Sequence, residues 1–101
     1  MATWLVTRHP GALAWLLEQG FTEVKHVPHL QIGEVAAGDV VVGTLPVHLA
    51  AEVCRRGARY LHLALDIPPD LRGIELSIAQ MAQCRARLEE YRVEHIAAED
   101  A

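Results

Sequence analysis

The segment that most constrains the fold is a short apolar run framed by glycines, DVVVG at residues 39–43. A strand that is apolar at consecutive positions is buried on both faces, as in parallel sheets that helices cover on both sides. An amphipathic stretch follows at 46–56, where Val47, Ala50, Ala51 and Cys54 recur with helical spacing. A buried strand that leads directly into a helix indicates a crossover unit, and therefore predicts an α/β fold.

The rest of the chain repeats this alternation of strands and helices. The last strand is expected to be followed by a fraying acidic tail at 97–100. The resulting order, β-α-β-β-α-β-α-β, predicts one Rossmann-like domain over residues 1–101, with a mainly parallel sheet and helices on its faces. The pattern places strands at 3–7, 22–27, 59–65 and 92–96, helices at 11–19 and about 78–91, and a loop at 66–75.

Composition narrows the possible partners. The formal net charge of −4 disfavours duplex nucleic acid, because affinity for a duplex comes largely from neutralising its phosphates. No apolar stretch is long enough for a membrane span and residues 1–7 do not look like a signal peptide, so we expect a cytoplasmic protein. Cys54 and Cys84 lack the paired spacing of zinc or redox motifs and are expected to be small buried side chains.

Two similar turns carry the residues that could bind a ligand. Both VTRHPG at 6–11 and VVVGTLP at 40–46 end a strand and bring a proline at the start of a helix. Ligands of parallel sheets collect beyond the carboxyl ends of the strands, where helix starts offer unpaired N–H groups and partial positive charge. Arg8, His9 and Thr44 would therefore surround an anion, and phosphate suits such a site best.

Neither turn contains a nucleotide-binding motif. The glycines of G-x-G-x-x-G and the lysine of the Walker loop are absent, which disfavours a dinucleotide oxidoreductase or a P-loop enzyme. The Arg-His-Pro-Gly string is similar to the Arg-His-Gly of histidine phosphatases, but that fold needs a far longer chain with further Arg and His positions.

Other polar residues have structural alternatives. Thr44 could be only a helix N-cap, and His62 could be a buried, hydrogen-bonded histidine. Asp66 ends a strand, while Arg72 and Glu75 lie in the long loop, where they could form either a lid or a surface ion pair.

Four strings carry a resemblance to a known family: TRHPGA (7–12), VPHL (27–30), GDVVVGTLPVHLAAEVCRRGARYLHLALDIP (38–68) and RGIEL (72–76). Together they resemble the Csx-sixteen family of accessory proteins found with type III CRISPR systems. The resemblance implies a homodimeric, Rossmann-like ring nuclease that binds cyclic tetra-adenylate and cleaves it to linear products. A two-fold axis would double two anion sites into four, matching the four phosphates of the ring.

The implied cleavage needs no metal or cofactor if a ribose 2′-OH attacks its own phosphate and leaves a 2′,3′-cyclic phosphate. Placement assigns charge stabilisation to Arg8 and to the amides of both helix starts, and proton transfer to His9 or His48. Further ligand contacts are expected from Thr7, Pro10, Gly11, Gly43, Thr44, Leu45, Asp66, Arg72 and Glu75.

Three alternatives stay open. Asp66 and Glu75 could recruit Mg²⁺, although two carboxylates on a loop make a poor cage. The protein could bind cyclic oligoadenylate without cleaving it, as a sponge. It could also be a structural or regulatory subunit that binds no nucleotide.

Overall fold

The structure is a computed structural model that describes residues 1–98. The end of the acidic tail that was predicted to fray lies outside the described residues. Among those residues, no helix is long and apolar enough to cross a membrane.

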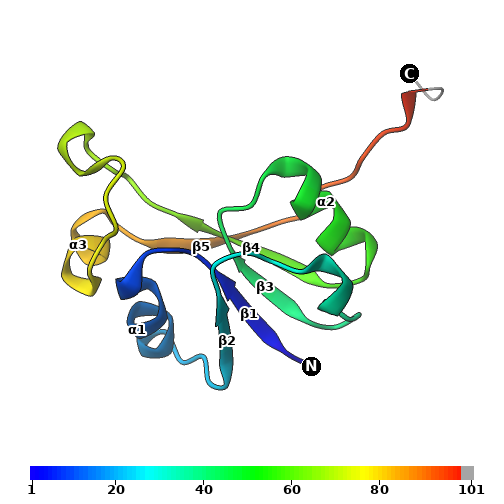
Figure 1. Cartoon of the computed structure of the whole chain (residues 1–101), viewed down its shortest axis with the longest axis horizontal. Helices are drawn as coiled ribbons and strands as arrows, with labels where there is room; N and C mark the ends of the chain where they lie inside the picture. The colour runs from blue at the N-terminus through cyan, green and yellow to red at the C-terminus, as the bar shows by residue number, and fades with distance from the viewer. Residues whose placement is uncertain (99–101) are drawn as a thin grey trace.

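A five-stranded sheet forms the centre of the molecule, in the order β2-β1-β3-β4-β5 (Figure 1). The first four strands are parallel and β5 runs antiparallel to β4. This arrangement confirms the predicted α/β fold with a mainly parallel sheet, and it places the 24–27 strand at an edge. The strands are β1 (Thr3–Val6), β2 (Val24–Val27), β3 (Val40–Gly43), β4 (Arg59–Ala64) and β5 (Arg87–Tyr91).

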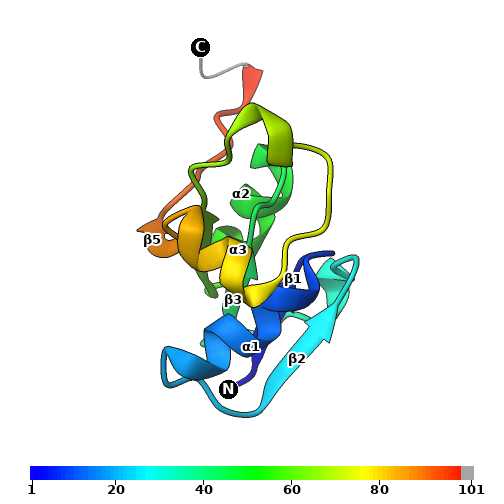
Figure 2. The same ribbon diagram turned by 90° about the vertical axis from the view of Figure 1, so that its left-hand side faces the viewer.

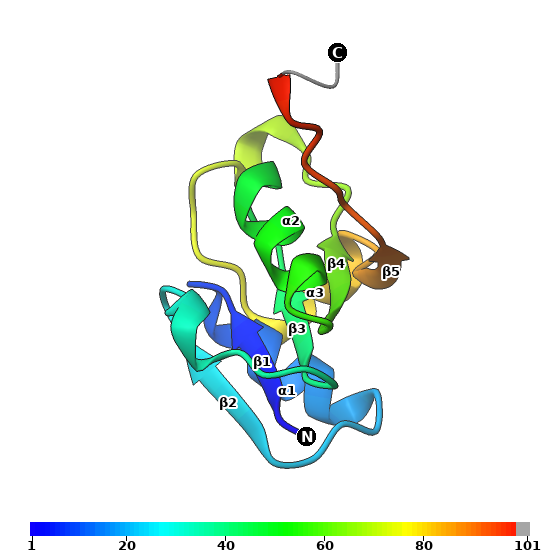
Figure 3. The ribbon, with the colours of Figure 1, turned by 90° about the vertical axis from the view of Figure 1, so that its right-hand side faces the viewer.

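Helices cover both faces of the sheet (Figures 1 and 3). One face packs against α1 (Pro10–Glu18) and α3 (Ile78–Gln83), and the other against α2 (Val47–Arg55). Two short 3₁₀ helices, η1 (Ile32–Glu34) and η2 (Pro69–Leu71), lie in the connections. Each sheet face therefore has its own apolar core.

The central strand β3 shows why the apolar run dictates this architecture. Val41 and Val42 are both completely buried, but Val41 belongs to the core under α2 and Val42 to the core under α1 and α3. Successive side chains of a strand point to opposite faces, so a strand without polar positions needs cover on both sides.

A buried carboxylate organises the amino-terminal edge of the sheet. Asp39 is 4% exposed and accepts hydrogen bonds from the Ala2 and Ala36 N–H groups and from Trp4 Nε1 at 2.9–3.1 Å. These bonds hold the pKa of Asp39 at about 2, below its usual 3.8, and the bond from the Ala2 N–H has the largest effect. This carboxylate joins the beginning of β1 to the segment before β3, far from the opposite strand ends.

The carboxyl-terminal third differs from the sequence-based prediction. The helix expected at about 78–91 ends at Gln83, and residues 87–91 form strand β5, so the strand expected at 92–96 is wrong. Arg85 adopts a positive φ of 57°, which breaks the helix without glycine or proline. Pairing with β4 then outweighs the helix propensity of a segment rich in Arg, Leu and Glu, because tertiary pairing routinely overrides a weak local preference.

Both cysteines are free thiols. Cys84 is buried as predicted, whereas Cys54 is half-buried, and its sulfur accepts from the Val93 N–H at 3.4 Å. This contact ties the segment after β5 to α2.

Candidate functional site

The first and third strands end side by side. Val6 of β1 pairs with Gly43 of β3 in a parallel register, which confirms the predicted adjacency of the two strand ends. The chain leaves β1 for α1 on one face of the sheet and leaves β3 for α2 on the other. This is a topological switch point, the place where open α/β sheets form ligand crevices.

The turn after β1 exposes a cation. The Thr7 hydroxyl oxygen accepts from the His9 N–H at 3.1 Å, which shapes the turn, and the Thr7 carbonyl lies 3.0 Å from His26 Nε2. Arg8 is exposed, and within residues 1–98 it makes neither an ion pair nor a side-chain hydrogen bond. A guanidinium held at a strand end without an internal partner is free to meet an anion.

The start of α1 is closed by the loop that follows β4. The Gly11 N–H donates to the Leu76 carbonyl at 3.0 Å, and the Leu76 N–H donates to His9 Nδ1 at 3.0 Å. Pro10 has no N–H, and the Ala12 N–H donates back to the His9 carbonyl. The amides of α1 are therefore occupied within the fold, contrary to the expectation that both helix starts offer donors. Figure 2 shows the loop returning to α1.

The start of α2 is open. Pro46 occupies the N-cap position, and the Leu49 and Ala50 N–H groups both donate to its carbonyl. For the Val47 and His48 N–H groups, no acceptor is found among the described residues. The first N–H groups of a helix lie at its positive end. At the start of α2 the Val47 and His48 N–H groups are free, within residues 1–98, to bind a ligand, whereas at the start of α1 the N–H groups are hydrogen-bonded within the fold.

The residues before α2 hold its start in place. Thr44 is not the N-cap: its exposed side chain donates from Oγ1 to the Leu63 carbonyl at 3.1 Å. The Leu45 N–H donates to the Tyr60 hydroxyl at 3.0 Å. A side chain at Gly43 would press on the backbone of Val6, so glycine allows the two strand ends to approach.

His9 and His48, predicted to serve one anion, lie in different surroundings. His9 is held between α1 and the 65–77 loop, whereas His48 is exposed on α2. His48 lines a groove of about 1030 Å³ between α2 and residues 90–95, with Glu52 and Arg55. Arg8 and Thr44 do not line this groove, and the strand ends themselves form no enclosed cavity among those found in the described part of the chain.

The predicted loop residues divide in the same way. Asp66 forms ion pairs with Arg85 at 3.7 Å and Arg87 at 3.3 Å, so its carboxylate fastens the α3–β5 connection. Arg72 and Glu75 are both exposed, and no ion pair joins them within residues 1–98. In the same residues, no group of three His, Cys, Asp or Glu side chains is arranged to hold a metal ion.

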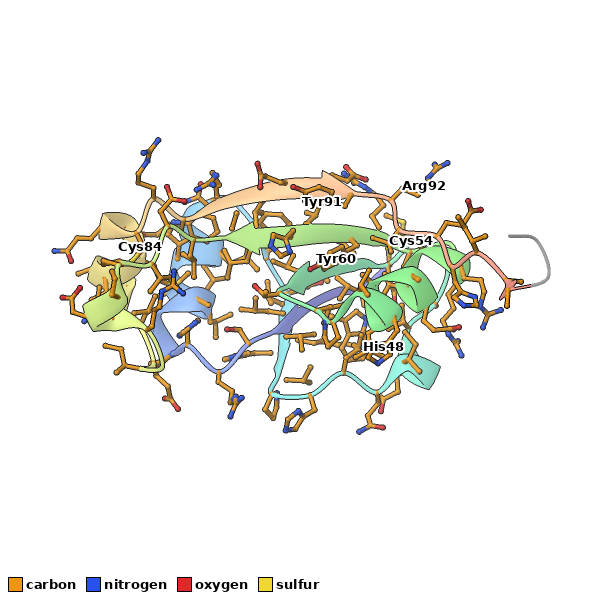
Figure 4. The ribbon with its side chains drawn as sticks, turned by 90° about the horizontal axis from the view of Figure 1, so that it is seen from above. His48, Cys54, Tyr60, Cys84, Tyr91 and Arg92 are labelled. Carbon is orange, nitrogen blue, oxygen red and sulfur yellow. The ribbon has the colours of Figure 1, made fainter. Side chains whose placement is uncertain are left out.

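An aromatic cluster, to which the sequence pattern assigned no functional role, lies beneath α2. Tyr60 and Tyr91 are opposite each other on β4 and β5 (Figure 4), and His62 Nδ1 lies 2.7 Å from the Tyr60 hydroxyl. Burial raises the pKa of Tyr60 above its usual 10.0. The alternation of Tyr60 and His62 already placed both on one face, but Tyr91 was assigned to a helix, which hid the cluster.

Comparison with known proteins identifies a family. Residues 4–94 match the model of a family described as "Putative CRISPR-associated protein (Cas_VVA1548)". No curated protein and no solved structure matches the chain.

Proposed function

The chain belongs to the CRISPR-associated family Cas_VVA1548, and from this premise we propose that it is a ring nuclease that binds cyclic tetra-adenylate and cleaves it to linear products. Such an enzyme would switch off the nucleotide signal of type III CRISPR defence. Ring nuclease activity is what the resemblance to the Csx-sixteen proteins implies, and this resemblance rests on the strings at 7–12, 27–30, 38–68 and 72–76.

One observation carries the proposal: an unpaired Arg8 and the open start of α2 follow two adjacent parallel strands. Phosphodiester groups are singly charged anions that helix N-termini and guanidinium groups bind well. The net charge of −4 restricts such binding to a local site, which suits a small cyclic oligonucleotide better than a duplex.

The reaction we propose is an intramolecular transesterification. The ribose 2′-oxygen forms a bond to phosphorus, the bond from phosphorus to the 5′-oxygen breaks, and a 2′,3′-cyclic phosphate and a 5′-hydroxyl result. Arg8 and the α2 amides would stabilise the charge on the phosphoryl oxygens. Thr44, whose proton goes to the Leu63 carbonyl, would accept a hydrogen bond from a ribose hydroxyl.

His9 and His48 are the residues to which we assign proton transfer. His9 Nδ1 accepts from the Leu76 N–H, so a neutral His9 carries its proton on Nε2 and would give it to the leaving 5′-oxygen. His48, in the first turn of α2, would take the proton of the attacking 2′-hydroxyl. The two helices start on opposite sides of the sheet edge, which matches an in-line displacement that separates the attacking and leaving oxygens.

A homodimer would complete the site. Each protomer would offer two cationic positions, Arg8 and the start of α2, so a two-fold axis at this edge would give four positions for the four phosphates of the ring. The sequence also predicted two anion sites per chain, at the starts of α1 and α2. In the structure the start of α1 is closed, and Arg8 would provide the second site instead.

Turnover by the purified protein tests the proposal. A small molar amount of protein is incubated with excess cyclic tetra-adenylate in EDTA, and the products are identified by chromatography and mass spectrometry. We expect many equivalents of linear product ending in a 2′,3′-cyclic phosphate, and a loss of roughly 10²–10³-fold in kcat for Arg8→Ala.

Arg56→Ala is the matched control, because Arg56 is exposed at the carboxyl end of α2 and does not line the groove that contains His48. It should retain wild-type turnover. Binding with at most one equivalent of product would identify a sponge instead of an enzyme. Absence of binding, seen as an unchanged thermal unfolding temperature, would reject both.

A further inference from the structure

A small pocket lies beneath the start of α2, and Leu45 of the second turn forms part of its wall. It has a volume of about 230 Å³ and lies next to the open amides of Val47 and His48. Its walls are apolar and aromatic: Leu45, Val47 and Val93 contribute aliphatic surface, and Tyr60, His62 and Tyr91 contribute rings. Val47 is 72% exposed and Tyr91 is 48% exposed, so the pocket opens to the surface between them.

The hydrogen bonds around Tyr60 favour the His62 tautomer that is protonated on Nδ1, because only that arrangement gives all three partners of the hydroxyl a hydrogen bond. The single hydroxyl proton of Tyr60 serves the Gly43 carbonyl at 3.2 Å, while its oxygen accepts from the Leu45 N–H. The third partner, His62 Nδ1 at 2.7 Å, completes the set when it donates. Neutral His62 then carries its proton on Nδ1 and presents the lone pair of Nε2, which has no partner among residues 1–98.

Shape and chemistry together define the occupant. The volume of about 230 Å³ leaves room for a flat ring system such as a bicyclic base. The His62 and Tyr91 rings meet edge to face with centroids 5.8 Å apart, giving aromatic surface against which a flat base can pack. The single unpaired acceptor, Nε2, requires a donor on that base.

We propose that this pocket holds an adenine base, with the His62 Nε2 atom accepting a hydrogen bond from the exocyclic amine, beside the phosphate at the start of α2. This assignment rests on the proposed function for the identity of the nucleotide. It makes His62 a binding residue that selects the base and leaves proton transfer to His9 and His48.

Binding measurements on three proteins test the assignment: wild type, His62→Leu and His95→Leu. His95→Leu is the control, because His95 is exposed on the segment after β5 and does not line the pocket. We expect His62→Leu to weaken cyclic tetra-adenylate binding by more than about tenfold, since each of the two chains that share a ring loses one hydrogen bond, and His95→Leu to leave it unchanged.

NMR titration of wild-type protein with adenosine monophosphate should shift the ring signals of His62 and Tyr91. Purine riboside monophosphate lacks the exocyclic amine. It should bind to wild type more weakly than adenosine monophosphate does, and the two nucleotides should bind equally well to His62→Leu. Wild-type binding of the cyclic nucleotide with no loss in His62→Leu would overturn the pocket and leave the proposed function standing.

A different result would reject the proposed function and support the pocket. If adenosine monophosphate shifts these rings while cyclic tetra-adenylate does not bind, the proposed function fails and the adenine pocket is supported. If neither nucleotide perturbs His62 or Tyr91, the pocket assignment is wrong.

Discussion

Asp39 and Arg8 illustrate two uses of a charged residue in this fold. The Asp39 carboxylate is buried and receives three hydrogen bonds, whereas the Arg8 guanidinium is exposed and unpaired within residues 1–98. Among the described residues, every buried side-chain nitrogen or oxygen has a hydrogen-bond partner. Free polar groups are therefore confined to the surface, where a ligand can reach them.

The depressed pKa of Asp39 predicts a pH-dependent contribution to stability. The pKa falls from 3.8 to about 2 on folding, so the ionised carboxylate contributes roughly 2 kcal/mol above pH 3.8. This contribution is lost as the pH falls from 3.8 towards 2. We expect Asp39→Asn to lower the free energy of unfolding at pH 7, with a deficit that shrinks at pH 2, as measured by urea denaturation.

Asp70→Asn is the control for this measurement, because Asp70 is exposed on η2 and makes no side-chain hydrogen bond in the described part of the chain. It should unfold like wild type at both pH values. A deficit of Asp39→Asn that is equally large at pH 2 would show that the charge of the carboxylate is not the cause.

At the scale of elements, local sequence patterns predicted a helix or strand correctly where tertiary packing favours the same structure. The apolar run of β3 predicted a strand buried on both faces, and the structure confirms it. The helix α2 was also predicted, but of its apolar stripe only Ala50 is buried: Val47 is exposed, and Val53 fills the core instead. The segment 87–91 could not be assigned in this way, because its residues favour a helix and its strand state depends on pairing with β4. A single sequence carries no signal of that long-range pairing.

The candidate site was predictable to the same extent. The strand-to-helix turns located the edge and its residue types, including Arg8. The closure of α1 by Leu76 was not predictable, because it joins residues more than sixty positions apart through one backbone hydrogen bond and one bond to the His9 side chain. The aromatic pocket was missed because it needs Tyr91 on a strand.

The contact between α1 and the start of α3 yields a stability prediction. A Cβ at Gly11 would collide with the backbone of Ser77 and Ile78. We expect Gly11→Ala to destabilise the protein by about 1–3 kcal/mol, although alanine favours helices, because a backbone neighbour cannot move aside as a flexible side chain can. Thermal unfolding should show a lower Tm.

Gly33→Ala is the matched control, since nothing lies within 4 Å of a Cβ at Gly33 and its φ is not in the left-handed region. Its Tm should stay the same or rise slightly. A Gly11→Ala protein as stable as wild type would mean that the two segments are not held as closely as the structure has them.

At the scale of the whole molecule, the fold is a flat layer with extents of 45 × 31 × 19 Å. The cationic positions lie on one edge of this layer, at the ends of β1 and β3, and Arg8 and Thr44 line neither the groove along α2 nor the pocket beneath it. A phosphate ring resting there would be exposed on one side. A second copy related by a two-fold axis would supply the missing side.

This geometry leads to a prediction of stoichiometry. Isothermal titration should give one cyclic tetra-adenylate per two chains, and light scattering should give a complex of twice the 11.1 kDa chain mass. Arg8→Ala removes two of the four cationic positions in a dimer, so it should weaken binding while leaving the mass of the free protein unchanged. One ring bound per monomer would contradict the two-fold site, because a single chain would then supply every phosphate contact from one open edge.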